Sequence, residues 1–302
     1  MTASSIIASL LLPGLLHNQP VRIAALAGGI VAIVLGVVGT FTVIRGQSFA
    51  GHALADVGAA GGSAAVYFSL SALTGFVAFN VIAAGILELI GVRRAKGRDL
   101  ATGIVLGAAL GVAALFLYLD SIFSNTTGVA ASVLFGSILT LPTSQILPLF
   151  LLGIVAVGII AVTHRPLLLA SLEPTLASAR GLPVRTIGAL FLLSLAIAVS
   201  LSAIAIGAIL STALLIGPAA AALRIARRPS HAMLLAGGIA FIAVLAGLVL
   251  SYESYGWPPL HHGWPVSFFV VAIIYLTYFV IDVIARRRST RTHILVRTEE
   301  AS

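Results

Sequence analysis

Two side chains in a stretch rich in glycine and alanine have the types and the spacing that metal binding needs. The stretch runs from Ser48 to Gly62, and His52 and Asp56 lie four residues apart inside it. On a helix this spacing puts both side chains on one face. An imidazole and a carboxylate are suitable ligands for Zn²⁺, Mn²⁺ or Fe²⁺. The pair is therefore a candidate metal site.

Two other interpretations of the pair stay open. The imidazole and the carboxylate could form an internal hydrogen bond that only holds helices together, or they could relay a proton. The small neighbouring residues would let other helices approach closely and complete a coordination sphere. If the stretch crosses a membrane, a charge inside it is costly and is by default a functional candidate.

Composition indicates that the stretch does cross a membrane. The 302 residues are 60% hydrophobic and only 9% charged, whereas about a quarter of the residues in a soluble domain are charged. Lipid solvates apolar side chains directly, so such a chain is typical of an integral membrane protein. The sequence has no cysteine, which excludes disulfides and thiolate metal ligands.

Apolar runs predict an all-α polytopic bundle of about nine spans, because a spanning helix needs about 20 apolar residues. The stretch 128–141 is apolar but too short to span, so we expect a re-entrant or surface-lying segment there. We expect an N-terminal interfacial segment at 1–20, a membrane domain at 21–285 and a basic cytoplasmic tail at 286–302. The predicted spans are 22–44, 49–70, 72–91, 100–119, 146–162, 186–203, 205–223, 232–250 and 265–284.

The basic residues predict the orientation of the bundle. With the N-terminus outside, Arg22 is the one residue among the 17 Lys and Arg that falls in an outer segment. Cytoplasmic loops carry an excess of Lys and Arg, so the C-terminus is expected in the cytoplasm. The net charge of +8 is thus interpreted as a topology signal, and no nucleic-acid partner is expected.

The other acidic residues in apolar runs have simpler interpretations. Glu88 precedes Arg93 and Arg94, and Asp282 precedes Arg286, so both acids are expected to be ion-pair partners at the membrane interface.

Three more residues fall in the predicted outer loops. Asp120 is expected at a helix end beside an outer loop, where it could also line an entrance. His261 and His262 lie in an outer loop with Trp257; they could capture metal, although such residues are ordinary at an interface.

The predicted cytoplasmic loop 163–185 contains a short helix of its own, at about 173–180. Proline in the first turn favours a helix start, and glycine followed by proline favours a stop. Such a helix could dock into a groove on a partner protein or lie on the membrane surface. The residues expected to couple to a partner are Glu173, Pro174, Leu176, Ala177, Arg180 and Gly181.

A phosphate-binding loop of the Walker type is absent from the sequence. That motif needs Gly-Lys followed by Ser or Thr, but the only lysine, Lys96, is followed by Gly97. The chain is therefore not expected to be an enzyme, and ATP-driven transport would require another subunit.

Several segments share their order and spacing with one family. They are Gly39–Arg45, Gly51-His52-Ala53, Arg98–Val105, Leu134–Leu139, Glu173–Leu182, Gly207–Leu210 and Leu214–Ala220. Over residues 28–284 the chain resembles the membrane permeases of metal-type ABC importers, which serve zinc, manganese and iron.

The resemblance implies a set of partners. They are a second copy of the permease, two ATP-binding subunits that use the ATP, and an extracytoplasmic metal-binding protein, in the cytoplasmic membrane of a bacterium. It implies Zn²⁺ or Mn²⁺ as the transported ion and no cofactor bound by this chain.

The sequence departs from the family at the metal site. In the family an Asp four residues before the His joins it, and here that position is Ser48. We hypothesise that Asp56, four residues after His52, takes the carboxylate role. Two rival functions stay open: a secondary transporter driven by an ion gradient, and an ABC permease for chelated iron or cobalamin.

Overall fold

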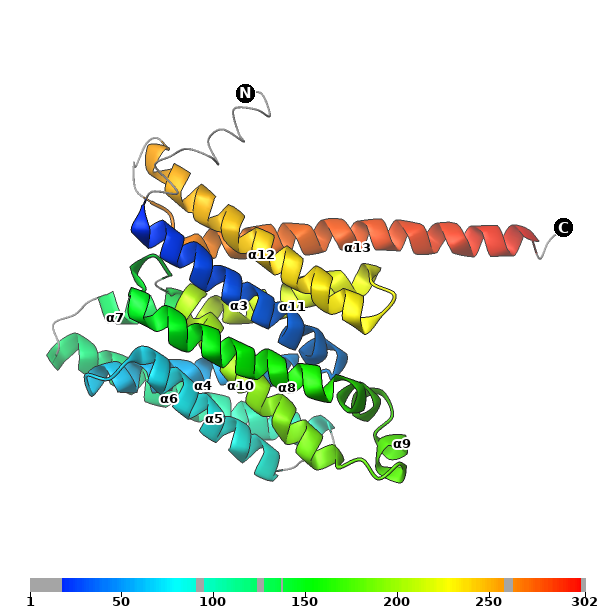
Figure 1. Cartoon of the computed structure of the whole chain (residues 1–302), viewed down its shortest axis with the longest axis horizontal. Coiled ribbons are helices and arrows are strands. Elements are labelled where there is room, and N and C mark those ends of the chain that lie inside the picture. The colour runs from blue at the N-terminus through cyan, green and yellow to red at the C-terminus, as the bar shows by residue number, and fades with distance from the viewer. Residues whose placement is uncertain (1–17, 91–94, 124–127, 137, 258–262, 300–302) are drawn as a thin grey trace.

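The computed structural model describes residues 18–90, 95–123, 128–136, 138–257 and 263–299, and within these ranges it contains helices and no strand (Figure 1). The shorter helices are α7 (Gly128–Phe135), α9 (Pro174–Ala179) and 3₁₀ turns at Ile138–Thr140, Thr143–Gln145 and Ser254–Gly256. The long helices are α3 (Gln19–Ile44), α4 (Ser48–Tyr67), α5 (Ala72–Ile90), α6 (Ala95–Phe123), α8 (Ile146–Leu172), α10 (Val184–Ile206), α11 (Ala208–Ile225), α12 (Pro229–Glu253) and α13 (Val266–Glu299). The all-α bundle is confirmed.

Eight of the long helices in the described ranges are long and apolar enough to cross a membrane, and α4 is the long helix outside this set. The reason is its position. Every residue of α4 from Ala53 to Ala65 is buried, because α5, α6, α10 and α11 pack around it. A helix shielded from lipid by protein does not need large apolar side chains, which is why α4 falls outside this set.

Small residues decide how closely α4 and α5 pack. A methyl group on Gly61 or on Gly75 would collide with the backbone oxygen of the other residue, so the two helices touch backbone to backbone. Farther along α5, the Asn80 side chain donates a 2.9 Å hydrogen bond to the Ser200 hydroxyl on α10, and Ser200 donates to the Phe76 carbonyl. Small-residue contacts and interhelical hydrogen bonds are the usual means of helix association in lipid, where apolar burial gives little driving force.

The boundary between α10 and α11 is set by Gly207. Its φ of +88° is a left-handed backbone conformation that a side chain disfavours. Gly136, which ends α7, has a φ of +82°, and a methyl group on either glycine would collide with the backbone of the other. The end of α7 is thus packed tightly against the boundary between α10 and α11. The segment 128–141 does not span the membrane, as predicted.

Two predicted span ends were wrong. α8 continues to Leu172 instead of ending at 162, with Pro166 inside the helix, so the connection to α10 is shorter than expected. The run of leucines after Pro166 provides apolar side chains that keep the last part of α8 helical and packed. α6 continues to Phe123, which puts Asp120 inside the helix instead of at its end.

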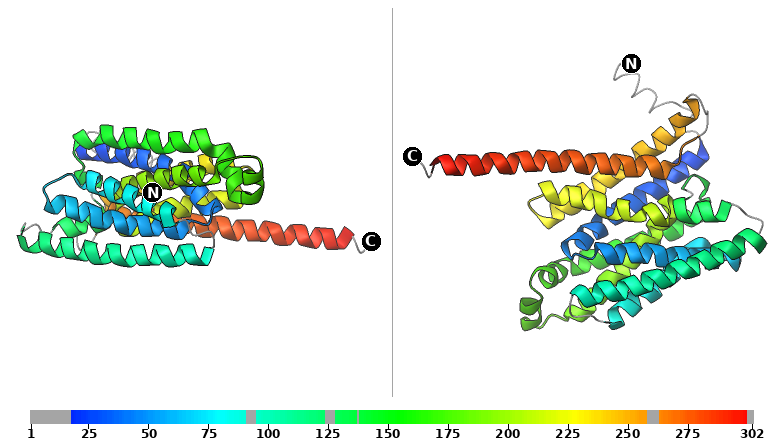
Figure 2. Two further views of the ribbon diagram at one scale, coloured as in Figure 1. Left: turned by 90° about the horizontal axis from the view of Figure 1, so that it is seen from below. Right: turned by 180° about the vertical axis from the view of Figure 1, so that it is seen from behind.

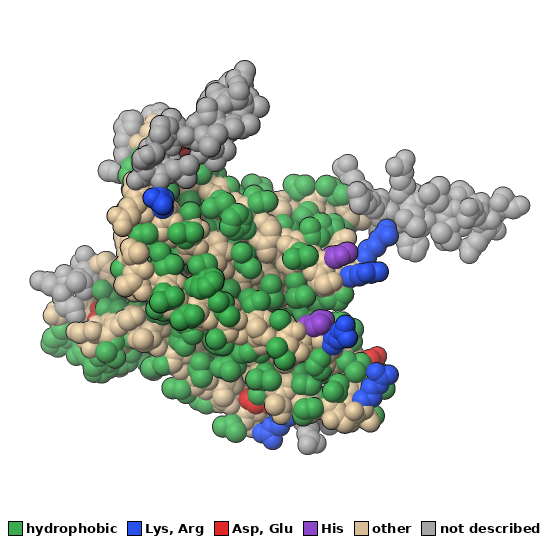
Figure 3. All heavy atoms as spheres, in the orientation of Figure 1, with side chains coloured by type: hydrophobic (Ala, Val, Ile, Leu, Met, Phe, Trp, Pro, Cys, Tyr) green, Lys and Arg blue, Asp and Glu red, His purple; other side chains and the backbone are tan. Residues whose placement is uncertain are grey.

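The two ends of the bundle differ in charge. We call them the α9 end, where α3, α5, α8 and α11 finish, and the α7 end, where α3 starts (Figure 1). On the face shown in Figure 3, most Lys and Arg side chains lie toward the α9 end, with apolar side chains between the two ends. α13 begins at the α7 end and projects well beyond the bundle at the α9 end (Figure 2).

The structure describes the two predicted terminal segments to different extents. Most of the predicted interfacial segment at 1–20 lies outside the described residues. At the other end, residues 286–299 continue α13 with no boundary at 286.

Candidate functional site

The structure brings His52 and Asp56 together near the α9 end of α4. The distance from His52 Nε2 to Asp56 Oδ2 is 3.8 Å. The Asp56 side chain is 11% exposed and the His52 side chain 45% exposed, so the carboxylate is buried more deeply and the imidazole is partly exposed at the surface of the single chain. The helical spacing therefore gives the shared face that the sequence predicts.

A third polar group completes this site, and sequence reasoning missed it. The Thr212 hydroxyl on α11 lies 3.2 Å from His52 Nδ1, within hydrogen-bond distance. Gly51 makes the approach of α11 close, because a methyl group there would lie 2.6 Å from Leu215 Cδ2. Thr212 lies between Leu210 and Leu214, in the gap between two family-like segments, and its polarity in an apolar run was the available signal.

The donor set offered by one chain is small. Across the described ranges, no group of three or more His, Asp or Glu side chains comes together. Ser48 lies one turn before His52 on the same helix and is partly buried. One imidazole nitrogen, one carboxylate and nearby hydroxyls make a mixed nitrogen–oxygen set that suits Mn²⁺ or Zn²⁺ only when further ligands are added.

The other buried carboxylates near the α9 end are ion-paired. Arg286 donates to Asp282 at 2.7 Å, as the sequence predicts, and Arg224 approaches the same carboxylate at 3.3 Å. Glu88 pairs with Arg185 on α10 at 3.6 Å. The arginines expected to pair with Glu88, at 93 and 94, lie outside the described residues. These carboxylates therefore join helices and are not placed beside His52.

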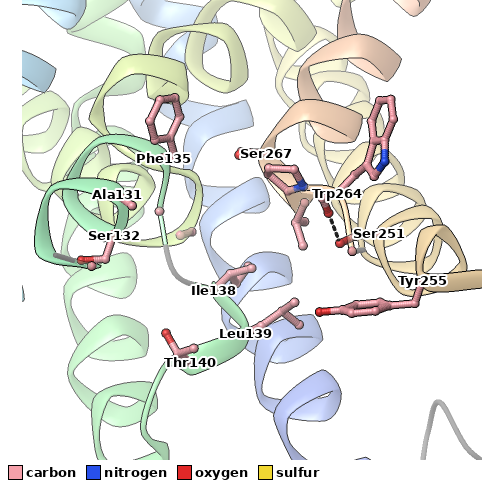
Figure 4. Close-up of a pocket in the computed structure, with 16 residues that line it drawn as sticks. Ala131, Ser132, Phe135, Ile138, Leu139, Thr140, Ser251, Tyr255, Trp264 and Ser267 are labelled. Atoms are coloured by element: carbon pink, nitrogen blue, oxygen red, sulfur yellow. Dashed lines mark hydrogen bonds between the residues drawn. The ribbon is translucent and has the colours of Figure 1, made fainter. Parts of the chain in front are cut away.

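The α7 end holds a cavity of about 550 Å³ (Figure 4). It is lined by α7, by Gly136, by the 3₁₀ turn Ile138–Thr140 and by the start of α13, and its polar groups are hydroxyls such as those of Ser132, Thr140 and Tyr255. In Figure 4 the Ser251 hydroxyl is seen donating to the Trp264 carbonyl, at 2.6 Å. No His or carboxylate lines the described part of this cavity, so it lacks metal ligands there.

Two predicted outer-loop candidates have different outcomes. Asp120 is only 1% exposed inside α6, and neither carboxylate oxygen has a hydrogen-bond partner in the described chain. Its expected place at the end of the helix was wrong, since α6 continues for another three residues. His261 and His262 lie outside the described residues, so metal capture by them stays a prediction.

The predicted short helix is α9, between α8 and α10. Pro174 is its first residue, and Gly181 follows it with a φ of +75°, as expected of a helix stop. Ala177 is buried against the bundle, while Leu176 is 42% exposed and Arg180 is exposed. α9 thus presents an apolar side chain and a cation outward at the end of the molecule.

Comparison with known families decides the classification. The family model described as the ABC 3 transport family matches residues 18–281, which includes every long helix except the last part of α13. The chain belongs to the ABC 3 transport family. It is therefore an integral membrane transport component, as predicted from the resemblance to ABC permeases.

Two named bacterial proteins are similar to this chain over most of its length. The Listeria innocua protein named manganese transport system membrane protein MntC is 30% identical over 195 residues, which cover 65% of this chain and 68% of the relative. The Streptococcus pneumoniae protein named manganese import system permease protein ScaB is 29% identical over 241 residues, covering 78% of this chain and 81% of the relative.

Two solved structures share the fold. PsaBC from Streptococcus pneumoniae, solved with a Fab, superposes with a TM-score of 0.76 at 24% identity, covering 91% of this chain and 95% of that chain. A metal-chelate type ABC transporter in an inward-facing conformation superposes with a TM-score of 0.70 at 16% identity, covering 87% and 85%. At these identities the likeness shows the fold alone.

Proposed function

We propose that this chain is the permease subunit of an ATP-driven importer that carries Mn²⁺ or Zn²⁺ across the cytoplasmic membrane of a bacterium. The observation that carries the proposal is the group formed by His52, Asp56 and Thr212, on two helices in the middle of the bundle. The names of the similar proteins, which are manganese transport proteins, support this choice of substrate class.

In this proposal His52 and Asp56 are the metal ligands, and Asp56 supplies the carboxylate that the family has at the position of Ser48. Both positions are one turn from His52 on α4, so either can reach a metal held by the imidazole. Mn²⁺ and Zn²⁺ both accept such ligands, the former favouring oxygen and the latter nitrogen.

A second copy of the permease would supply the ligands that one chain lacks. Because the His52 side chain is 45% exposed in the single chain, its ring faces an opening that another copy can cover. Two copies facing each other would bring two imidazoles and two carboxylates to one ion. This is the homodimer that the family resemblance implies.

The charge distribution supports the orientation of the proposal. The α9 end carries most of the cations and is taken as cytoplasmic, with the C-terminus on that side. One ATP-binding subunit would dock on α9 of each copy, two in all, and the extracytoplasmic metal-binding protein would deliver metal at the α7 end. ATP hydrolysis belongs to the docked subunits.

Transport then follows an alternating-access cycle. ATP binding closes the two ATP-binding subunits and displaces α9. The displacement tilts the helices attached to α9, and the ion held by His52 and Asp56 is exposed first to one side and then to the other.

The test of the proposed function is transport by the reconstituted complex. Proteoliposomes holding the permease and its ATP-binding partner should take up radioactive manganese or zinc when ATP is supplied on the α9 side. Uptake that needs no ATP but follows an imposed ion gradient would favour the secondary transporter. Competition by iron chelates or cobalamin, but not by free Mn²⁺ and Zn²⁺, would favour the chelate permease.

A further inference from the structure

The turn between α3 and α4 fixes the start of the helix that carries His52. The turn has three residues, Arg45, Gly46 and Gln47. Gly46 has a φ of +61°, and its N–H donates to the Val43 carbonyl at 3.0 Å, while the Gln47 N–H donates to the Thr42 carbonyl at 2.9 Å. This closed helix end couples the turn to α3, so a force on Arg45 acts on the first turn of α4.

The Arg45 side chain reaches both helices that flank α9. Its Nη1 donates a 3.1 Å hydrogen bond to the Ser171 hydroxyl, in the last turn of α8. Its guanidinium carbon also lies 5.0 Å from the centre of the Phe191 ring on α10, a cation–π contact. Ser171 lies two residues before Glu173, where the α9 segment starts. Arg45 therefore contacts both helices that adjoin the proposed docking helix α9, namely α8 before it and α10 after it.

An acidic group lies at the same place. A methyl group on Gly188 of α10 would lie 3.7 Å from Glu88 Oε2 and 3.8 Å from Arg45 Nη2, so the carboxylate and the guanidinium share one small space. Glu88 also pairs with Arg185, whose side chain is 74% exposed. Charged hydrogen-bonding groups in a partly buried setting hold their geometry more strongly than apolar contacts do.

We infer that Arg45 is the positioning residue that passes displacement of α8, α9 and α10 to the start of α4, and so to His52. This inference rests on the proposed function. Apolar surfaces of neighbouring helices can slide past each other. The Arg45 guanidinium is hydrogen-bonded to Ser171 and in cation–π contact with Phe191, so Arg45 moves with both helices. Because His52 lies one turn inside α4, a tilt of the α3–α4 turn changes the position and the exposure of the imidazole.

The experiment measures metal ions transported per ATP hydrolysed, using the full complex in proteoliposomes. Arg45→Gln should lower this ratio by about fivefold or more, the lower end of ordinary coupling between sites. Arg45→Lys should recover part of the ratio, because an ammonium still donates to Ser171 and still faces Phe191. Ser171→Ala should lower it in the same direction. The affinity of the permease for Mn²⁺ and the recovery of the ATP-binding partner should stay within about twofold of wild type, far less than the coupling effect.

Arg185→Gln is the matched control, since it removes a cation from the same cluster but from an exposed side chain. Its transport ratio should match wild type. The inference is overturned if Arg45→Gln keeps the wild-type ratio, or if it loses metal affinity and partner recovery as much as coupling. If Arg45→Gln does not fold, a normal ratio in both Arg45→Lys and Ser171→Ala overturns it equally. A wild-type complex that transports no metal would instead refute the proposed function.

Discussion

The Thr212 hydroxyl lies 3.2 Å from His52 Nδ1, on a different helix from the imidazole. When Nδ1 donates its proton to this hydroxyl, Nε2 keeps the lone pair and faces Asp56, which is the arrangement that metal binding needs. A residue that orients a metal-binding histidine in this way is commonly worth about 10–100-fold in metal affinity.

The first prediction concerns Thr212 itself. Thr212→Val keeps the shape of the side chain but removes the hydroxyl, and we expect the affinity for Mn²⁺ and Zn²⁺ to fall by about 10–100-fold. Thr212→Ser keeps the hydroxyl and should bind nearly as wild type. Calorimetric titration of the purified permease measures both. Equal affinities for the valine and serine variants would show that the hydroxyl does not orient His52.

The second prediction separates the role of the carboxylate from its position. Asp56→Asn should abolish measurable metal binding, because it removes the only carboxylate beside His52 among the described residues. Adding Ser48→Asp to that variant should restore binding, since position 48 lies one turn from His52 on the other side. The same titration reports both changes. Wild-type affinity in Asp56→Asn would remove Asp56 from the site.

The third prediction concerns the contact between Gly136 and Gly207. Gly207→Ala places a methyl group in a left-handed conformation and against the backbone of α7. The backbone strain costs about 1–2 kcal/mol and the overpacking about 1–3 kcal/mol more. We therefore expect a lower melting temperature in detergent. Gly158→Ala on α8 is the control, because no atom lies near the added methyl group, and it should be as stable as wild type. A Gly207→Ala protein that melts at the wild-type temperature would show that the close contact between Gly136 and Gly207 is not needed for stability.

The fourth prediction tests α9 as the docking segment. The double variant Glu173→Arg, Leu176→Asp replaces an acid at the start of α9 and its exposed leucine, so recovery of the ATP-binding partner should fall by about tenfold or more. Leu70→Asp changes another exposed leucine, at the α7 end, and should leave recovery unchanged. Co-purification on a tagged permease measures this. Equal recovery of the partner from both variants would argue that docking takes place elsewhere.

The sequence predicted the all-α membrane bundle and the shared face of His52 and Asp56. These features depend on hydropathy and on the period of one helix, which a sequence carries directly. The same holds for α9, whose start at Pro174 and stop at Gly181 are local signals.

The contacts of Thr212 and Arg45 could not be predicted in this way. Each joins helices that are far apart in the chain, and no periodicity encodes which helices will pack together. The end of α8 was missed because Pro166 and the polar residues before it are typical of a loop, whereas the neighbouring helices keep that turn helical. Asp120 was misplaced for a related reason, since polarity suggested a helix end and α6 continues past it.

The proposed function requires that metal held by His52 and Asp56 is moved at the expense of ATP. The most direct measurement is the ATPase activity of the reconstituted complex with and without added Mn²⁺ or Zn²⁺, for wild type and for Asp56→Asn. We expect metal to stimulate the wild-type activity and to leave the Asp56→Asn complex at its basal rate. Equal stimulation of both complexes by metal, or stimulation of neither at a saturating metal concentration, would contradict the proposed function.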